Sequence, residues 1–143
     1  MAREIFRGRI PDDRLYSLEY DMWVRHERGD VVIGATSFGI HLAGKIIGFT
    51  SKPRGAEIDC GRGLGTIECA KTVLAVHSPV SFKLLTMNEE LEEHPSILNQ
   101  DAYDAGWMSR GQPTAWDEES ALLVDATIYR AHVMHIEPRA ELE

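Results

Sequence analysis

Residues 64–79, LGTIECAKTVLAVHSP, decide how this chain is interpreted. Residues 64–68 and 73–77 have the β-branched and apolar content of strands, and the small residues between them predict a tight reversal. Lys71, one of only four lysines, lies on this turn. A plain solvated lysine is common on a surface turn. Covalent attachment of a cofactor is the alternative, because a side chain at the end of a hairpin contacts little of its own fold.

The rest of the chain predicts one small, mainly β domain over residues 1–143. Thr36 is expected to cap a short helix that continues to Leu42 and closes at Gly44. Residues 94–113 are expected to be loop with one short strand at 106–110. The other expected strands lie at residues 16–24, 31–33, 45–50 and 78–87, and turns are expected at 27–30 and 52–55.

The tail gives the clearest helical pattern, over residues 114–137. Thr114 and Asp117 suggest a capping arrangement, and Pro138 ends the helix. One face carries apolar residues at helical spacing, which predicts packing against the sheet. These residues are Leu122, Ala126, Tyr129 and Val133.

Charge and composition exclude several classes of function. The net charge of −8 argues against nucleic acid as a partner, because binding to phosphates requires clustered Lys and Arg. No apolar run is long enough to span a membrane, so no membrane partner is expected and a cytoplasmic location is predicted. Cys60 and Cys69 do not have the spacing of a metal site and are expected to be free thiols.

Three other patterns favour structural roles. Gly61, Gly63 and Gly65 lack the spacing of a nucleotide-binding loop and predict a turn with a bulge. His132 and His135 have no apparent third ligand, so we expect surface histidines and no metal site. No serine or cysteine triad has a recognisable context, and no catalytic residue is assigned.

The sequence downstream of Lys71 resembles a known family. The order Pro79-Val-Ser81, Asn88-Glu-Glu-Leu91, Gly106-Trp107 and Asp125-Ala-Thr127 is similar to that of the glycine cleavage H-protein and its lipoate-carrying relatives. The similarity extends from about residue 15 to residue 129. Each piece is short, and the specificity lies in their joint order around Glu68 and Lys71.

The resemblance implies a fold, a cofactor and partners. The fold is a flattened lipoyl-domain sandwich, a barrel-sandwich hybrid of two small antiparallel sheets with a C-terminal helix. Lys71 matches the lysine that carries covalent lipoic acid as a lipoyl-lysine. Glu68 and Gly55 match positions by which a lipoylating ligase recognises its target. The partners would then include this ligase and dihydrolipoamide dehydrogenase, and the chain itself would be a carrier without catalytic activity.

The pathway is the more open question. Phe82, Ala102 and His77 depart from the H-protein pattern, and residues 49–55 look more like lipoate-binding proteins that accompany heterodisulfide-reductase-like complexes in sulfur oxidation. We therefore expect an arm that carries sulfur, with the glycine cleavage carrier of an aminomethyl group as the alternative. Two further alternatives are an unmodified binding module and an enzyme with Cys69 or Lys71 as nucleophile.

Overall fold

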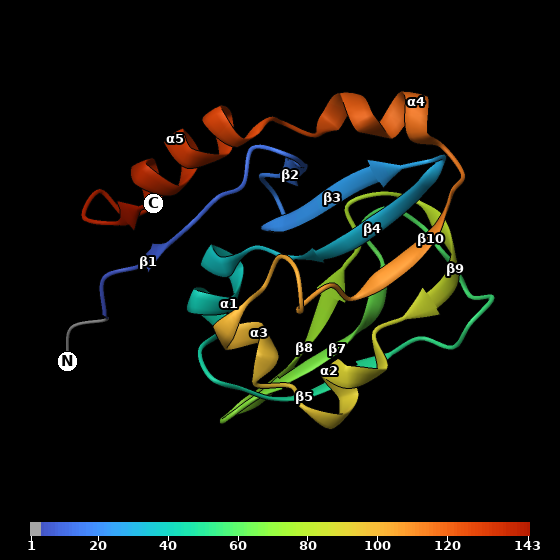
Figure 1. Ribbon diagram of the computed structural model, residues 1–143, viewed down its shortest axis with the longest axis horizontal. Helices are drawn as coiled ribbons and strands as arrows, with labels where there is room; N and C mark the ends of the chain where they lie inside the picture. Colours follow the sequence, from blue (N-terminus) through green and yellow to red (C-terminus); the bar gives the residue numbers. More distant parts are fainter. Residues whose placement is uncertain (1–3) are drawn as a thin grey trace.

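Two antiparallel sheets and a short parallel pair of strands make up the computed structural model, which describes residues 4–143 (Figure 1). The strands are β1 (Arg7–Gly8), β2 (Leu15–Ser17), β3 (Met22–Glu27), β4 (Asp30–Ala35), β5 (Ile46–Ser51), β6 (Glu57–Ile58), β7 (Gly63–Cys69), β8 (Thr72–His77), β9 (Phe82–Met87), β10 (Ser109–Pro113) and β11 (Glu141–Leu142). The helices are α1 (Ser37–Ala43), α2 (Glu89–Glu93), α3 (Ile97–Gln100), α4 (Trp116–Glu119), the 3-10 turn η1 (Ser120–Leu122) and α5 (Ala126–Ile136).

The larger sheet has the strand order β2-β3-β4-β10-β9-β6, and the smaller one has the order β5-β7-β8. In the view of Figure 1, the smaller sheet lies below the larger one, and α4 and α5 run along the side of β2 and β3. The expectation of a mainly β fold with two antiparallel sheets and a C-terminal helix is therefore confirmed. The parallel pair β1-β11, which joins the two ends of the described chain, was not expected.

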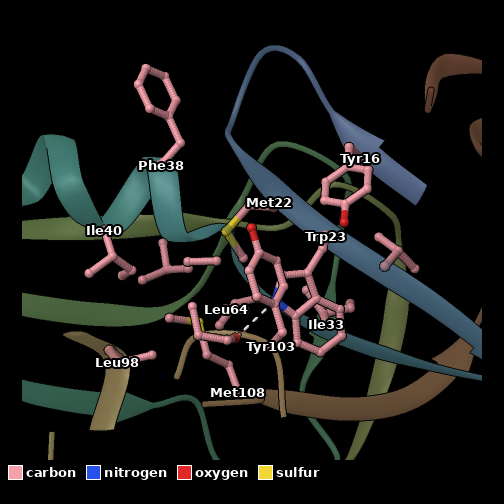
Figure 2. Close-up of a cluster of buried hydrophobic side chains, with 14 of the residues drawn as sticks. Tyr16, Met22, Trp23, Ile33, Phe38, Ile40, Leu64, Leu98, Tyr103 and Met108 are labelled. Atoms are coloured by element: carbon pink, nitrogen blue, oxygen red, sulfur yellow. Dashed lines mark hydrogen bonds between the residues drawn. The ribbon is translucent and has the colours of Figure 1, made fainter. Parts of the chain in front are cut away.

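Aromatic side chains hold the larger sheet and α5 together. Trp23 is fully buried, and its indole N–H donates to the Ala102 carbonyl oxygen at 3.0 Å (Figure 2). Tyr16 and Tyr129 stack with ring centroids 4.7 Å apart, which fixes α5 against β2. A buried aromatic pair stabilises the fold through its apolar area and through the stacking geometry.

Several local expectations are confirmed. The Thr36 hydroxyl accepts from the Gly39 N–H at 2.9 Å and caps α1, which closes at Gly44. The expected bulge in the glycine-rich segment lies between Gly63 and Gly65, where the register of β7 against β8 shifts. Within residues 4–143, no helix has the length and apolar character needed to cross a membrane.

The single helix expected over residues 114–137 is wrong. The helical segment breaks after η1, because Val124 forms two backbone hydrogen bonds with Tyr16, at 2.8 and 2.9 Å. Asp125 then caps a new helix by accepting from the Ile128 N–H at 2.9 Å, so Thr114 is not the cap. Ala126, Tyr129 and Val133 are buried as expected, whereas Leu122 precedes the break and is 71% exposed.

Two other boundaries also differ from the expectation. Residues 16–24 form a hairpin of β2 and β3, because Asp21 adopts a left-handed conformation (φ 54°) that short polar side chains tolerate. Residues 94–113 contain α3, and the strand β10 begins only at Ser109. His135 is exposed, and His132 is half-buried with its ring beside that of Tyr129.

Candidate functional site

Lys71 lies in a two-residue turn between β7 and β8, as the sequence predicts. The strands pair from Cys69 and Thr72 outward, which leaves only Ala70 and Lys71 in the connection. Both of these residues are exposed. Below the turn, Cys69 and Ile46 are paired across β7 and β5, and both are buried. The hairpin is therefore anchored in the core up to the last residue before the turn.

The Lys71 amine has no partner among residues 4–143. Across the described residues 4–143, no hydrogen bond or salt bridge involves this amine. A buried or ion-paired lysine would contradict a role in attachment, since the amine must enter the active site of another protein. The observed position leaves the amine available to such an enzyme.

Glu68 lies close to the turn on the solvent side of the small sheet. It pairs with Val73 on β8 and with Gly48 on β5. A methyl group on Gly48 would lie 3.1 Å from a Glu68 carboxylate oxygen, so the glycine makes room for this side chain. In the part of the chain that the structure describes, no hydrogen bond or salt bridge holds the Glu68 carboxylate.

Gly55 is not brought near Lys71. It follows β5 at the end where Ser51 pairs with Gly65, whereas Lys71 lies beyond the opposite end of the hairpin. Gly55 has a φ of +86°, and its N–H donates to the Leu84 carbonyl at 2.8 Å. Because L side chains rarely adopt this conformation, the turn itself gives a reason for a glycine there.

A pocket of about 270 Å³ lies beside the hairpin and was missed by the sequence analysis. Leu74 and Val76 of β8 line one wall, and Ile40 of α1 contributes to another. At its rim, Tyr20 and His77 stack with ring centroids 5.3 Å apart. In the sequence, His77 was noted only as a departure from the H-protein pattern, and nothing there indicated a pocket.

Asp21 supplies the one carboxylate among the residues that line this pocket. Its oxygen accepts from the Tyr129 hydroxyl at 2.8 Å, and that hydroxyl also lies 2.8 Å from the Thr36 hydroxyl. Burial raises the pKa of Asp21 above its ordinary value, against the lowering effects of the Tyr129 hydrogen bond and of His132. The pocket is therefore mainly apolar, and its carboxylate is already engaged by α5.

Neither cysteine has the environment of a nucleophile. Cys69 is buried at the end of β7, and Cys60 is half-buried with its thiol donating to the Pro79 carbonyl. Burial, Glu119 and Glu19 all raise the pKa of Cys60, so its thiolate is disfavoured. Both thiols are free, and no cluster of three or more His, Cys, Asp or Glu within residues 4–143 is placed to hold a metal ion.

Comparison with known proteins identifies the family. The family model described as "Glycine cleavage H-protein" matches residues 14–136. This chain belongs to the glycine cleavage H-protein family. The glycine cleavage system H protein 5 of Aquifex aeolicus is 34% identical over 127 residues, which is 86% of each chain. The H protein of Listeria monocytogenes serotype 4b is 36% identical over 115 residues, covering 80% of this chain and 90% of the relative.

The H-protein fold is also shared with a solved structure. The crystal structure of a glycine cleavage system H protein from Mycobacterium marinum superposes with a TM-score of 0.76 and 28% identity, covering 87% of this chain and 98% of that one. The cofactor of the H-protein family is a lipoyl group bound covalently to a lysine. These relatives support a lipoyl carrier, but they give no support to the sulfur-oxidation branch that we favoured from the sequence.

Proposed function

We propose that this chain is the lipoyl carrier of a glycine cleavage system and that Lys71 is its attachment residue. The observation that carries the proposal is the exposed Lys71, which has no partner among residues 4–143 and lies on a two-residue turn of a hairpin anchored in the core. Membership of the H-protein family supports the cofactor and the pathway. The chain then acts by presenting a cofactor to other enzymes, without catalysis of its own.

The surroundings of Lys71 fit a lipoyl group. The lysine stem and the lipoyl chain together have a length of roughly 14 Å by ordinary bond lengths. Leu74, on the wall of the pocket, is three residues along β8 from Lys71, or about 10 Å at the rise of a strand. The apolar lining suits a hydrocarbon chain and a disulfide ring. When bound, the lipoyl group supplies a reversible disulfide that accepts and releases a group on sulfur.

The residues of the chain position the arm and offer it a shielded place. Lys71 holds the attachment point clear of the fold, and the apolar wall formed by Leu74, Val76 and Ile40 excludes water from whatever enters the pocket. The partners on this proposal are a lipoylating ligase, the other enzymes of glycine cleavage and dihydrolipoamide dehydrogenase. Glu68 is the recognition residue that the ligase would contact, and Gly55 contributes by fixing the backbone of a distant turn.

Intact mass spectrometry tests the attachment residue. After incubation with a lipoylating ligase, lipoate and ATP, the wild-type chain should gain the mass of one lipoyl group, and Lys71→Arg should gain none. Lys45→Arg is the matched control, because Lys45 is another exposed lysine of the same chain and should leave the gain unchanged. A lipoyl group on Lys71→Arg, or none on the wild type, would contradict the proposal.

Carriage of sulfur in a heterodisulfide-reductase-like complex is a second candidate, because the pocket lining is mainly apolar. An aminomethyl group carries an amine, which prefers a carboxylate partner, and Asp21 is the one carboxylate among the lining residues. A sulfur cargo needs no such partner. The two candidates are separated by offering the lipoylated chain glycine with its decarboxylating enzyme, or a persulfide donor, and weighing the product. A mass gain only with glycine would eliminate the second candidate.

A further inference from the structure

The two faces of the hairpin next to Lys71 have opposite characters. Directly paired residues of neighbouring strands share a face. The row formed by Phe49, Ile67 and Leu74 points toward the interior, since Phe49 and Ile67 are 4% and 7% exposed. The adjacent row of Gly48, Glu68 and Val73 therefore lies on the solvent side. Val73 is only two residues after Lys71 in the sequence.

Apolar side chains on this solvent side gather at the end that carries Lys71. Val73 is 60% exposed, and Ile47, the extra residue of the β5 bulge beside Glu68, is 48% exposed. The next row on the solvent side, farther from Lys71, holds Thr50, Thr66 and Ala75, whose side chains are polar or small. Strand propensity alone is satisfied by threonine, so it does not explain two aliphatic side chains left in water at this end.

Glu68 is already the expected ligase contact, and we propose that Ile47 and Val73, which flank it, dock onto the same enzyme; we call the three residues the tip surface. The inference rests on the proposed function and deepens it. The lysine amine must enter the active site of that enzyme, so residues within two or three positions of it lie against the rim of the entrance. The tip surface meets this requirement without any movement of the hairpin.

The chemistry of the tip surface specifies its occupant. Ile47 and Val73 would bind an apolar rim on the ligase, because their burial there removes apolar area from water. Glu68 lies between them without a salt bridge or hydrogen bond to any of residues 4–143, and it calls for one Lys or Arg of the ligase. A charged pair surrounded by apolar contacts gives orientation as well as affinity. Docking in this way contributes to KM and leaves the amine itself unaltered.

Transfer kinetics on threonine variants test the docking surface. The apo chain is lipoylated with ligase, lipoate and ATP, and kcat/KM is measured by intact mass for the wild type, Ile47→Thr, Val73→Thr and the double variant. Threonine retains the β-branch, so the strands are preserved. We expect the double variant to lose about tenfold in kcat/KM, mainly through KM, which corresponds to the loss of modest apolar burial. Val73→Ile should retain the wild-type value.

The control is Leu85→Thr, because Leu85 is 45% exposed on β9 of the other sheet. Its kcat/KM should equal that of the wild type, and the reaction of the Lys71 amine with a small N-hydroxysuccinimide ester should be the same in all variants. Wild-type kinetics in the double variant, or an equal loss in Leu85→Thr, would overturn the docking surface while the attachment at Lys71 stands. A wild-type chain that gains no lipoyl group would overturn the proposed function, and the docking surface with it.

Discussion

Two hairpins of this molecule turn in two residues, and their turns are built differently. The β3–β4 turn consists of Arg28 and Gly29, with φ values of +51° and +86°. Positive φ at both positions matches the twist of the flanking strands. The β7–β8 turn consists of Ala70 and Lys71, and neither has a positive φ.

The side chains around the two turns also differ, because only the β3–β4 turn is flanked by ionic contacts within residues 4–143. At the β3–β4 turn, the guanidinium nitrogens of Arg110 on the neighbouring strand lie 3.1 Å from a Glu27 carboxylate oxygen and 3.9 Å from an Asp30 carboxylate oxygen. At the β7–β8 turn, the Lys71 amine is bound by nothing among residues 4–143. The first turn is stabilised by its own conformation and by ionic contacts, whereas the second presents a side chain. The comparison teaches that the geometry of a turn alone does not identify a modification site.

A transplanted lysine gives the largest expected effect. In the Lys71→Arg background, Arg28→Ala with Gly29→Lys places the pair Ala-Lys in the β3–β4 turn. We expect no lipoyl group on this chain after treatment with ligase, lipoate and ATP, because the tip surface is missing there. Peptide mapping locates any modification, and lipoylation of Lys at position 29 would show that exposure on a tight turn is sufficient.

Substitution of the small residue in each turn should lower the free energy of unfolding more at the β3–β4 turn than at the β7–β8 turn. Gly29→Ala should lower the free energy of unfolding by about 1–2 kcal/mol, because a side chain at positive φ is strained, although nothing lies within 4 Å of the added methyl group. Ala70→Gly should cost less than about 1 kcal/mol, through the entropy of the unfolded chain. Urea denaturation of both variants measures the difference. Equal losses would mean that the two turns are not distinguished by backbone conformation.

The smallest expected effect concerns the ionic contacts of the β3–β4 turn. The hydrogen bond from Arg110 holds the pKa of Glu27 below its ordinary value of 4.5. A depressed pKa stabilises the fold above the ordinary value, and this contribution is lost as the pH falls through the folded-state pKa. Because Glu27 is partly exposed, Glu27→Gln should cost only about 0.5–1 kcal/mol at pH 7. The difference from the wild type in urea denaturation should disappear toward pH 3, and a constant difference would exclude this contact as its source.

Much of the fold could be predicted where the signal is local. The small residues around Lys71, the cap at Thr36 and the glycines of residues 61–65 act through neighbouring backbone, and their turns, helix and bulge were predicted correctly. The tail could not be predicted in this way. Its helical pattern continues through Val124, but the pairing of Val124 with Tyr16, more than a hundred positions earlier, interrupts it. A contact of this range leaves no trace in local periodicity.

In the candidate site, too, the parts formed by residues close in sequence could be predicted and the parts formed by distant segments could not. Lys71 and Glu68 are close in sequence and lie close together at one end of the hairpin, so their association could be predicted. The pocket could not, because it forms where β8 meets α1 and the turn at Asp21, and each wall alone has the character of ordinary core. The exposure of Ile47 also depends on a bulge in β5 that no residue of that strand indicates.

The parallel pair β1-β11 has a practical consequence for engineering. It places Arg7 beside Glu141, and because the two strands run in the same direction, a linker from Glu143 back along the pair to Glu4 could join the ends of the described chain. New ends could then be opened between Arg28 and Gly29, where the turn is exposed. Such a circular permutant would keep the Lys71 hairpin in the middle of an uninterrupted stretch. It could then be immobilised or fused through a loop of the larger sheet, with the carrier end of the smaller sheet free to reach other proteins.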